Sequence, residues 1–163
     1  SWVGDGNNVL HDLLLAGVSL GHDVKYATPE GMEPNVEVIE RAEKIARQTG
    51  AQITATNDPS EAVTDAGVIY TDIFVSMGEE HMKDKFAAFE GFQVNEELVS
   101  NANDNYLFMH CLPAHRGEEV TDAVIDSKNS IVFDQAENRM WAQMSLLTYM
   151  CNPIAWNAYR DLY

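Results

Sequence analysis

Short apolar runs rich in β-branched or aromatic residues recur along the chain at intervals that suit a parallel sheet. Six runs have the length of strands: Trp2–Val3, 23–27, 52–56, 67–71, 106–110 and 130–133. Between these runs the apolar residues recur at helical spacing. Strands that alternate with helices predict a sheet with helices on both faces. We therefore expect an α/β domain with a doubly wound, Rossmann-like parallel sheet of five or six strands.

Helix start and stop residues support this order. Gly21 and Gly50 are placed to end two helices, and Asp58-Pro59 has the cap and first-turn proline of a third. The expected helices cover 8–20, 36–49, 60–64, 79–89, 95–99 and 136–150.

Polar residues gather where predicted strands give way to helices. Four such junctions carry residues suited to chemistry: 4–8, 72–78, 110–113 and 134–139. Because ligands of open parallel sheets bind beyond the carboxyl ends of the strands, we expect these four loops to converge on one site.

The first junction, Gly4-Asp5-Gly6-Asn7-Asn8, resembles a dinucleotide-binding fingerprint only in part. Val9 stands where the third glycine belongs, and no clear acidic residue ends the second strand. A nicotinamide site is therefore disfavoured, and we expect no cofactor. Asn8 is either an amide that binds the carboxylate or ammonium group of a ligand, or an ordinary helix cap.

Asp72 follows the apolar fourth strand, and Ser76-Met77-Gly78 comes shortly after it. A carboxylate at this position can bind or deprotonate an amine, while Ser76 and the backbone of the turn can hold an amino-acid head group. The alternative is that Asp72 only caps a helix or an Asx-turn.

Cys111 lies between His110 and Leu112-Pro113 at the end of the fifth strand. A lone cysteine there is either a small core residue or a thiol that faces a ligand together with backbone carbonyls. A Cys-His nucleophile is disfavoured because adjacent residues of a strand point to opposite faces.

Arg139 is one of few cations in the chain, and the pattern places it in the first turns of the last long helix. There it either binds an anionic or carbonyl oxygen of a ligand, or pairs with Asp134 or Glu137.

The amino-acid composition disfavours some classes of binding partner. The chain has 163 residues, 26 Asp and Glu against 10 Lys and Arg, and a formal net charge of −16. Nucleic-acid and membrane partners are disfavoured because both require clustered basic residues. Two isolated cysteines suggest neither a disulfide nor a metal site. Because no apolar stretch is long enough to cross a bilayer and the sequence starts without the pattern of a signal peptide, we expect a soluble, cytoplasmic protein. The charge is either a solvated surface or an attraction for a cationic substrate.

The motifs WVGDGNNVLH, TDIFVSMGEE, MHCLPAHRGEEVTD and VFDQAENR together resemble the ornithine-binding, C-terminal half of ornithine carbamoyltransferases, over residues 2 to about 150. SMG combined with HCLP points to the ornithine branch. The resemblance implies transfer of a carbamoyl group from carbamoyl phosphate to L-ornithine, giving L-citrulline and phosphate.

The resemblance also implies roles for individual residues. Ornithine would be held by Asn8, Asp72, Ser76 and Met77, with Asp72 at an amine. Cys111 and the Leu112 carbonyl would lie beside the reacting groups. Arg139 would polarise the carbamoyl oxygen, and Cys111, Asp72 and Arg139 would be the catalytic residues.

Some family features are missing from this sequence. The phosphate-binding Ser-Thr-Arg-Thr motif and the HPxQ-type segment do not occur, Asp12 replaces the usual Ser, and Phe74 replaces the common Trp. We expect a truncated, excised or engineered single domain over 1–150 that is inactive alone and meets carbamoyl phosphate only when the other domain is supplied. The tail 151–163 matches no family pattern, and its aromatic residues or the exposed domain interface would support a homo-oligomer. Two alternatives are a self-assembling scaffold and a carbamoyltransferase for putrescine or acylated ornithine.

Overall fold

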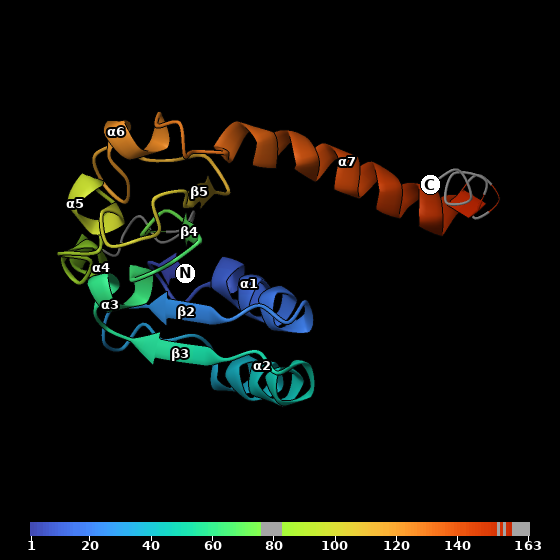
Figure 1. Cartoon of the computed structure of the whole chain (residues 1–163), viewed down its shortest axis with the longest axis horizontal. Coiled ribbons are helices and arrows are strands. Elements are labelled where there is room, and N and C mark those ends of the chain that lie inside the picture. The colour runs from blue at the N-terminus through green and yellow to red at the C-terminus, as the bar shows by residue number, and fades with distance from the viewer. Residues whose placement is uncertain (76–82, 153, 155, 158–163) are drawn as a thin grey trace.

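A five-stranded, fully parallel sheet forms the centre of the protein. The computed structural model describes residues 1–75, 83–152, 154 and 156–157. The strand order is β3-β2-β1-β4-β5 (Figure 1). The strands are β1 (Trp2–Val3), β2 (Val24–Ala27), β3 (Ile53–Thr56), β4 (Val68–Thr71) and β5 (Leu107–His110). The predicted doubly wound α/β class and its first five strands are confirmed.

The predicted sixth strand at 130–133 is wrong. Ser130 makes only an isolated parallel bridge to Phe108, and a helix begins at Val132. The side chain of Gln135 supplies the acceptor that another strand would have offered to β5, since the His110 amide donates to its Oε1 at 3.1 Å. The edge strand is thus completed by a side chain of the helix that follows.

Seven helices are assigned within the described residues. They are α1 (Asn8–Ser19), α2 (Val36–Thr49), α3 (Pro59–Val63), α4 (Lys83–Ala87), α5 (Glu96–Val99), α6 (Asp122–Ile125) and α7 (Val132–Cys151). Helix α2 has Asn35 as its N-cap and Gly50 as its C-cap, and both residue types are typical of these positions. The Asn35 side chain accepts from the Glu37 amide, and Gly50 has a φ of 83°. The last helix starts before the predicted residue 136, and 79–82 of the fourth predicted helix lie outside the described residues.

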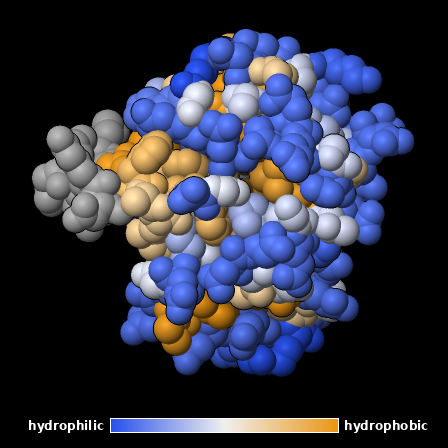
Figure 2. Space-filling model, turned by 90° about the vertical axis from the view of Figure 1, so that its left-hand side faces the viewer, coloured by the Kyte–Doolittle hydropathy of each residue, from blue (hydrophilic) through white to orange (hydrophobic). Residues whose placement is uncertain are grey.

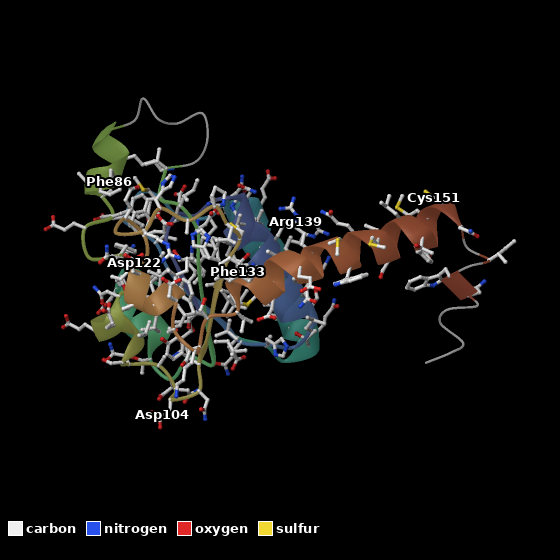
Figure 3. All side chains as sticks on the ribbon, turned by 90° about the horizontal axis from the view of Figure 1, so that it is seen from above. Phe86, Asp104, Asp122, Phe133, Arg139 and Cys151 are labelled. Carbon is white, nitrogen blue, oxygen red and sulfur yellow. The ribbon has the colours of Figure 1, made fainter. Side chains whose placement is uncertain are left out.

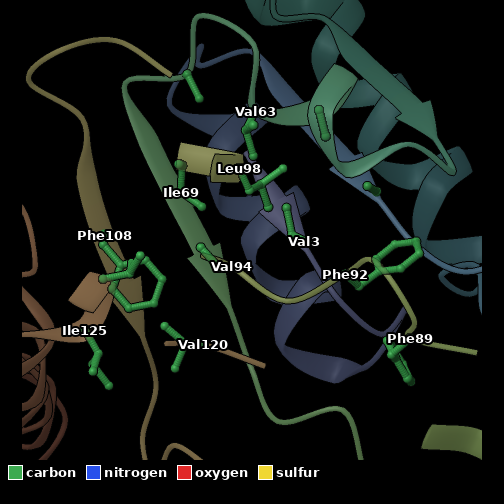
Figure 4. Close-up of a cluster of buried hydrophobic side chains, with 14 of the residues drawn as sticks. Val3, Val63, Ile69, Phe89, Phe92, Val94, Leu98, Phe108, Val120 and Ile125 are labelled. Atoms are coloured by element: carbon green, nitrogen blue, oxygen red, sulfur yellow. The ribbon is translucent and has the colours of Figure 1, made fainter. Parts of the chain in front are cut away.

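Two hydrophobic layers cover the two faces of the sheet. Trp2 packs with α1 and α2, whereas the next residue, Val3, packs in the layer of α3, α5 and α6. This is the alternation expected of successive strand residues. The second layer includes Ile69 and Phe108 from neighbouring strands (Figure 4). Burial on both faces fixes the sheet, and with it the loops at its carboxyl edge.

Gly6 is required by a close approach of two backbone segments. Its amide donates to the Met32 carbonyl at 3.0 Å, and a Cβ on Gly6 would overlap that oxygen and lie 2.5 Å from the Pro34 nitrogen. We expect Gly6→Ala to lower the free energy of unfolding by about 2 kcal/mol, because backbone must shift. Urea denaturation measures this. Gly67→Ala is the control, since a Cβ there meets nothing within 4 Å; equal losses in the two variants would contradict the explanation.

Helix α7 projects from the body of the protein (Figure 1). Phe133 and Arg139 lie on its proximal part and Cys151 at its far end (Figure 3). Many of its large apolar side chains are exposed, among them Phe133, Trp141, Leu147 and Met150. No helix in the described part of the chain has the length and apolar character that a membrane span requires.

The face at the left of Figure 1, formed around α3 to α5, is mostly hydrophilic, with apolar atoms gathered beside the segment drawn in grey (Figure 2).

Candidate functional site

Asp72 is the centre of a polar cluster just beyond the carboxyl end of β4. Its Oδ1 accepts hydrogen bonds from the Ile73 amide at 2.8 Å and from the Cys111 thiol at 2.9 Å. Its Oδ2 accepts from the Asn7 amide group at 3.1 Å. Three strand-to-helix junctions, those after β1, β4 and β5, therefore meet at one carboxylate, as the sequence predicts.

The Cys111 thiol is held in its protonated form. Burial raises the pKa of this thiol to about 12, from an ordinary value of 9.0, and the hydrogen bond and negative charge of Asp72 add to the shift. A thiol with that pKa is a poor nucleophile at neutral pH. Cys111 is therefore suited to donate a hydrogen bond rather than to form a covalent intermediate.

The cap of α1 is Asn7, not Asn8. The Asn7 Oδ1 accepts from the amides of Val9 and Leu10 at 2.9 and 3.2 Å. Asn8 is the first residue of the helix, and its exposed side chain forms no hydrogen bond with any residue that the structure describes. The ordinary-cap interpretation of Asn8 is thus wrong, and its side chain remains available to a ligand.

The turn that carries Cys111 is stabilised by hydrogen bonds to a buried carboxylate, that of Glu119. Glu119 and His110 are both fully buried, and Glu119 Oε1 lies 3.1 Å from His110 Nε2 and 2.6 Å from the His115 amide nitrogen. The Leu112 amide donates to His110 Nδ1 at 2.9 Å. Because Nδ1 accepts, Nε2 must carry the proton and donate to Glu119. His110 is therefore a neutral imidazole that links the Leu112 backbone to Glu119.

His110 does not activate Cys111. Its two ring nitrogens bond to the Leu112 amide and to Glu119, while the thiol donates to Asp72. The prediction that a Cys-His nucleophile is disfavoured agrees with this arrangement, although the reason differs. Cys111 lies one residue beyond the end of β5, and hydrogen-bond partners rather than strand alternation separate the two side chains.

Arg139 lies about two turns into α7, further from the helix start than predicted, because the helix begins at Val132. It is exposed and forms no ion pair or hydrogen bond with any described residue. The alternative of a salt bridge to Asp134 or Glu137 is therefore wrong, and Glu137 instead accepts from the Trp141 indole at 3.2 Å. The fourth junction contacts the two neighbouring strands through Gln135, whose amide group donates to the Tyr70 hydroxyl of β4 at 2.7 Å and accepts from the His110 amide of β5.

A nearly buried ion pair ties the first loop to α4. Lys85 Nζ lies 2.8 Å from Asp5 Oδ2, and the two side chains are only 9% and 13% exposed. The pair fixes the loop of Asp5 and Asn7 against the first helix described after Asp72.

Two groups of side chains have the composition of metal ligands. Asp72, His110 and Cys111 each place a donor atom within 4.8 Å of the other two, as do His115, Glu118 and Glu119. In the first group both His110 nitrogens already have hydrogen-bond partners within the protein, so neither offers a free lone pair to a metal. A metal ligand must be deprotonated and free to coordinate, so this group favours a hydrogen-bonding site.

The amino-acid sequence matches a known family model over most of its length. The model is that of the aspartate/ornithine carbamoyltransferase Asp/Orn binding domain, and it covers residues 1–150. The chain belongs to this carbamoyltransferase family. Its similar relatives include the catabolic ornithine carbamoyltransferase of Thermoplasma acidophilum, at 56% identity over 90% of this chain, and the anabolic enzyme of Pyrococcus furiosus, at 54% identity over 94%. The chain spans about half the length of these curated relatives, 48% and 49% respectively.

Solved carbamoyltransferase structures have the same fold. The ornithine carbamoyltransferase of Pyrococcus furiosus superposes with a TM-score of 0.86 at 56% identity, over 90% of this chain and 47% of its own. The anabolic enzyme of Campylobacter jejuni gives a TM-score of 0.88 at 37% identity, over 93% of this chain and 50% of its own.

Of the site residues that the sequence predicts, only some lie together in the described part of the structure. Asp72, Cys111 and Leu112 lie together, Asn8 lies at the adjoining helix start, and Arg139 makes no contact with them that the structure records. Ser76 and Met77 lie outside the described residues. Sequence reasoning missed Asn7 and Glu119. The doubled Asn of the first loop was a usable signal for Asn7, whereas nothing in the sequence singled out Glu119.

Proposed function

We propose that this chain binds L-ornithine at the loops around Asp72 and forms the amino-acid half of a carbamoyl-transfer site. One observation supports this above the others: a fixed carboxylate lies 2.9 Å from an uncharged thiol at the meeting point of three loops. Such a pair suits a primary amine that must bind as an ammonium ion and react as a neutral amine. The family of the chain and the names of its relatives agree with this substrate.

Asp72 would accept a hydrogen bond from the side-chain ammonium of ornithine. The Cys111 thiol and the Leu112 carbonyl would lie beside the same nitrogen, which must lose a proton before it attacks the carbamoyl carbon. Asn8, Ser76 and Met77 would hold the α-amino and carboxylate groups. Arg139 would stabilise the charge that develops on the carbamoyl oxygen.

Transfer also needs cations for the leaving phosphate. The three loops that meet at Asp72, namely 4–8, 72–75 and 110–115, contain no Lys or Arg. We propose that residues 1–150 are an ornithine-binding domain, that 151–163 are a tail, and that carbamoyl phosphate is held by a separate domain. By this proposal the 163-residue chain alone makes no citrulline at an appreciable rate.

Calorimetry tests the binding step. We expect L-ornithine to bind with a dissociation constant in roughly the millimolar range, and putrescine and N-acetylornithine to bind more weakly. Stronger binding of either competitor would favour the other carbamoyltransferase branch. No heat with any of the three amines would reject the proposed function. Citrulline formation by the isolated chain at rates near those of a two-domain enzyme would reject the requirement for a second domain.

Self-association is the second candidate function, and the exposed apolar side chains of α7 favour it. Phe133 is 71% exposed and Met150 is 69% exposed. Patches of this kind mark interaction surfaces. Light scattering on the full chain tests this candidate, since a monomer would exclude self-association through α7. An oligomer that persists in a chain ending at residue 150 would assign the contact to α7 rather than to the tail.

A further inference from the structure

We propose that Asn7 is a positioning residue that orients the Asp72 carboxylate so that one acceptor site, on Oδ2, faces the substrate amine. This inference rests on the proposed function and deepens it.

The orientation of the Asn7 amide is determined by its own helix. Its Oδ1 accepts from the backbone amides of Val9 and Leu10, which can only donate. The amide nitrogen Nδ2 must then point the other way, and it lies 3.1 Å from Asp72 Oδ2. The helix cap therefore fixes where the donor to Asp72 lies.

The two oxygens of Asp72 are not equivalent. Among the residues that the structure describes, Oδ1 has two donors, the Ile73 amide and the Cys111 thiol, whereas Oδ2 has only Asn7. A carboxylate accepts about four hydrogen bonds, two at each oxygen. One acceptor site on Oδ2 is thus left, and the geometry assigns it to the amine of the substrate.

The loop that carries Asn7 is held at fixed points. Asp5 pairs with Lys85 at 2.8 Å, and Gly6 bonds to the Met32 carbonyl. Asn7 is therefore fixed relative to both α1 and the Asp72 loop, as a positioning residue must be.

Substitutions at Asn7 can separate its two roles, which are to cap α1 through Oδ1 and to donate to Asp72 through Nδ2. Ser and Asp cap helices about as well as Asn, so Asn7→Ser and Asn7→Asp keep the bonds to the start of α1. Asn7→Ser has no amide group that reaches Asp72, and Asn7→Asp places a second carboxylate against Oδ2. Asn35 provides a matched control, since it caps α2 through the Glu37 amide at 2.8 Å.

Calorimetric titration of the full chain with L-ornithine is the first measurement. We expect Asn7→Ser to weaken ornithine binding roughly tenfold and Asn7→Asp to weaken it further, while Asn35→Ser and Asn35→Asp leave it unchanged. Thermal unfolding should change by similar small amounts in Asn7→Ser, Asn35→Ser and Asn35→Asp, and by more in Asn7→Asp, in which two carboxylates face each other. Unchanged affinity in both Asn7 variants, or equal losses at Asn7 and Asn35, would overturn the inference.

A second measurement needs no ligand, and it separates failure of this inference from failure of the proposed function. In a Cys151→Ser background, the pH dependence of Cys111 alkylation reports how firmly Asp72 holds the thiol. We expect Asn7→Ser to lower the alkylation pKa and Asn35→Ser to leave it unchanged. The same pKa in both variants would overturn the positioning role even if the chain binds no ornithine.

Discussion

Asp72→Asn is expected to weaken L-ornithine binding roughly 10- to 100-fold, because a hydrogen bond between charged groups contributes about 1.5–3 kcal/mol. The substituted amide keeps the shape of the side chain and loses its charge. Calorimetry measures the affinity. Asp104→Asn is the matched control, because Asp104 is an exposed residue before the amino end of β5, whereas the site lies beyond the carboxyl end of that strand. Equal affinities in the two variants would contradict the role of Asp72.

The same variant should change the titration of Cys111. Asp72 raises the pKa of this thiol through its hydrogen bond and its charge, in addition to burial. We therefore expect the thiol pKa of Asp72→Asn to fall below about 12 but to stay above 9.0. The raised pKa also means that the folded state holds its proton more tightly than the unfolded state. The thiol's contribution to stability is complete below pH 9.0 and is lost as the pH rises towards about 12.

Glu119→Leu is expected to lower the free energy of unfolding by about 3 kcal/mol. The substitution leaves two donors without an acceptor, the buried His110 Nε2–H and the part-buried His115 amide, and an unsatisfied buried donor costs about 1–3 kcal/mol. Glu119→Gln keeps an acceptor oxygen and should lose less. Urea denaturation measures both variants.

The neighbouring carboxylate of Glu118 is the control for this prediction. Its side chain is 49% exposed and its ion pair is to His115. Exposed ion pairs contribute about 0–1 kcal/mol, so Glu118→Leu should change stability little. A loss in Glu119→Leu as small as that in Glu118→Leu would show that the buried carboxylate does not hold the turn.

The strands were predictable because a strand that is buried on both faces of a sheet has a short run of apolar residues in the sequence. The run at 67–71 is apolar or hydroxylic and becomes β4, and Gly50 ends α2 as its residue type requires. The run at 130–133 has the same composition but is not a strand. Composition alone could not show that Gln135 satisfies the edge of β5 or that Val132 is buried as the first residue of a helix.

The candidate site was predictable at the level of loops and less so at the level of atoms. The sheet topology alone brings Asp72 and Cys111 to one edge, and the structure places them 2.9 Å apart. Which of two adjacent asparagines caps α1 depends on a one-residue difference in where the helix begins. The contact between His110 and Glu119 joins residues nine apart through a turn whose path no periodic pattern encodes.

Chemical-shift mapping of the full chain with L-ornithine is the most direct test of ornithine binding at the loops around Asp72. We expect ornithine to shift the backbone amide resonances of the three loops that meet at Asp72, those of Asn7, Ile73 and Leu112 among them. The resonances of Gly50 and Asp104, which precede the amino ends of β3 and β5 at the opposite edge of the sheet, should stay in place. Shifts confined to other parts of the chain, or no shifts at millimolar ornithine, would contradict binding at these loops.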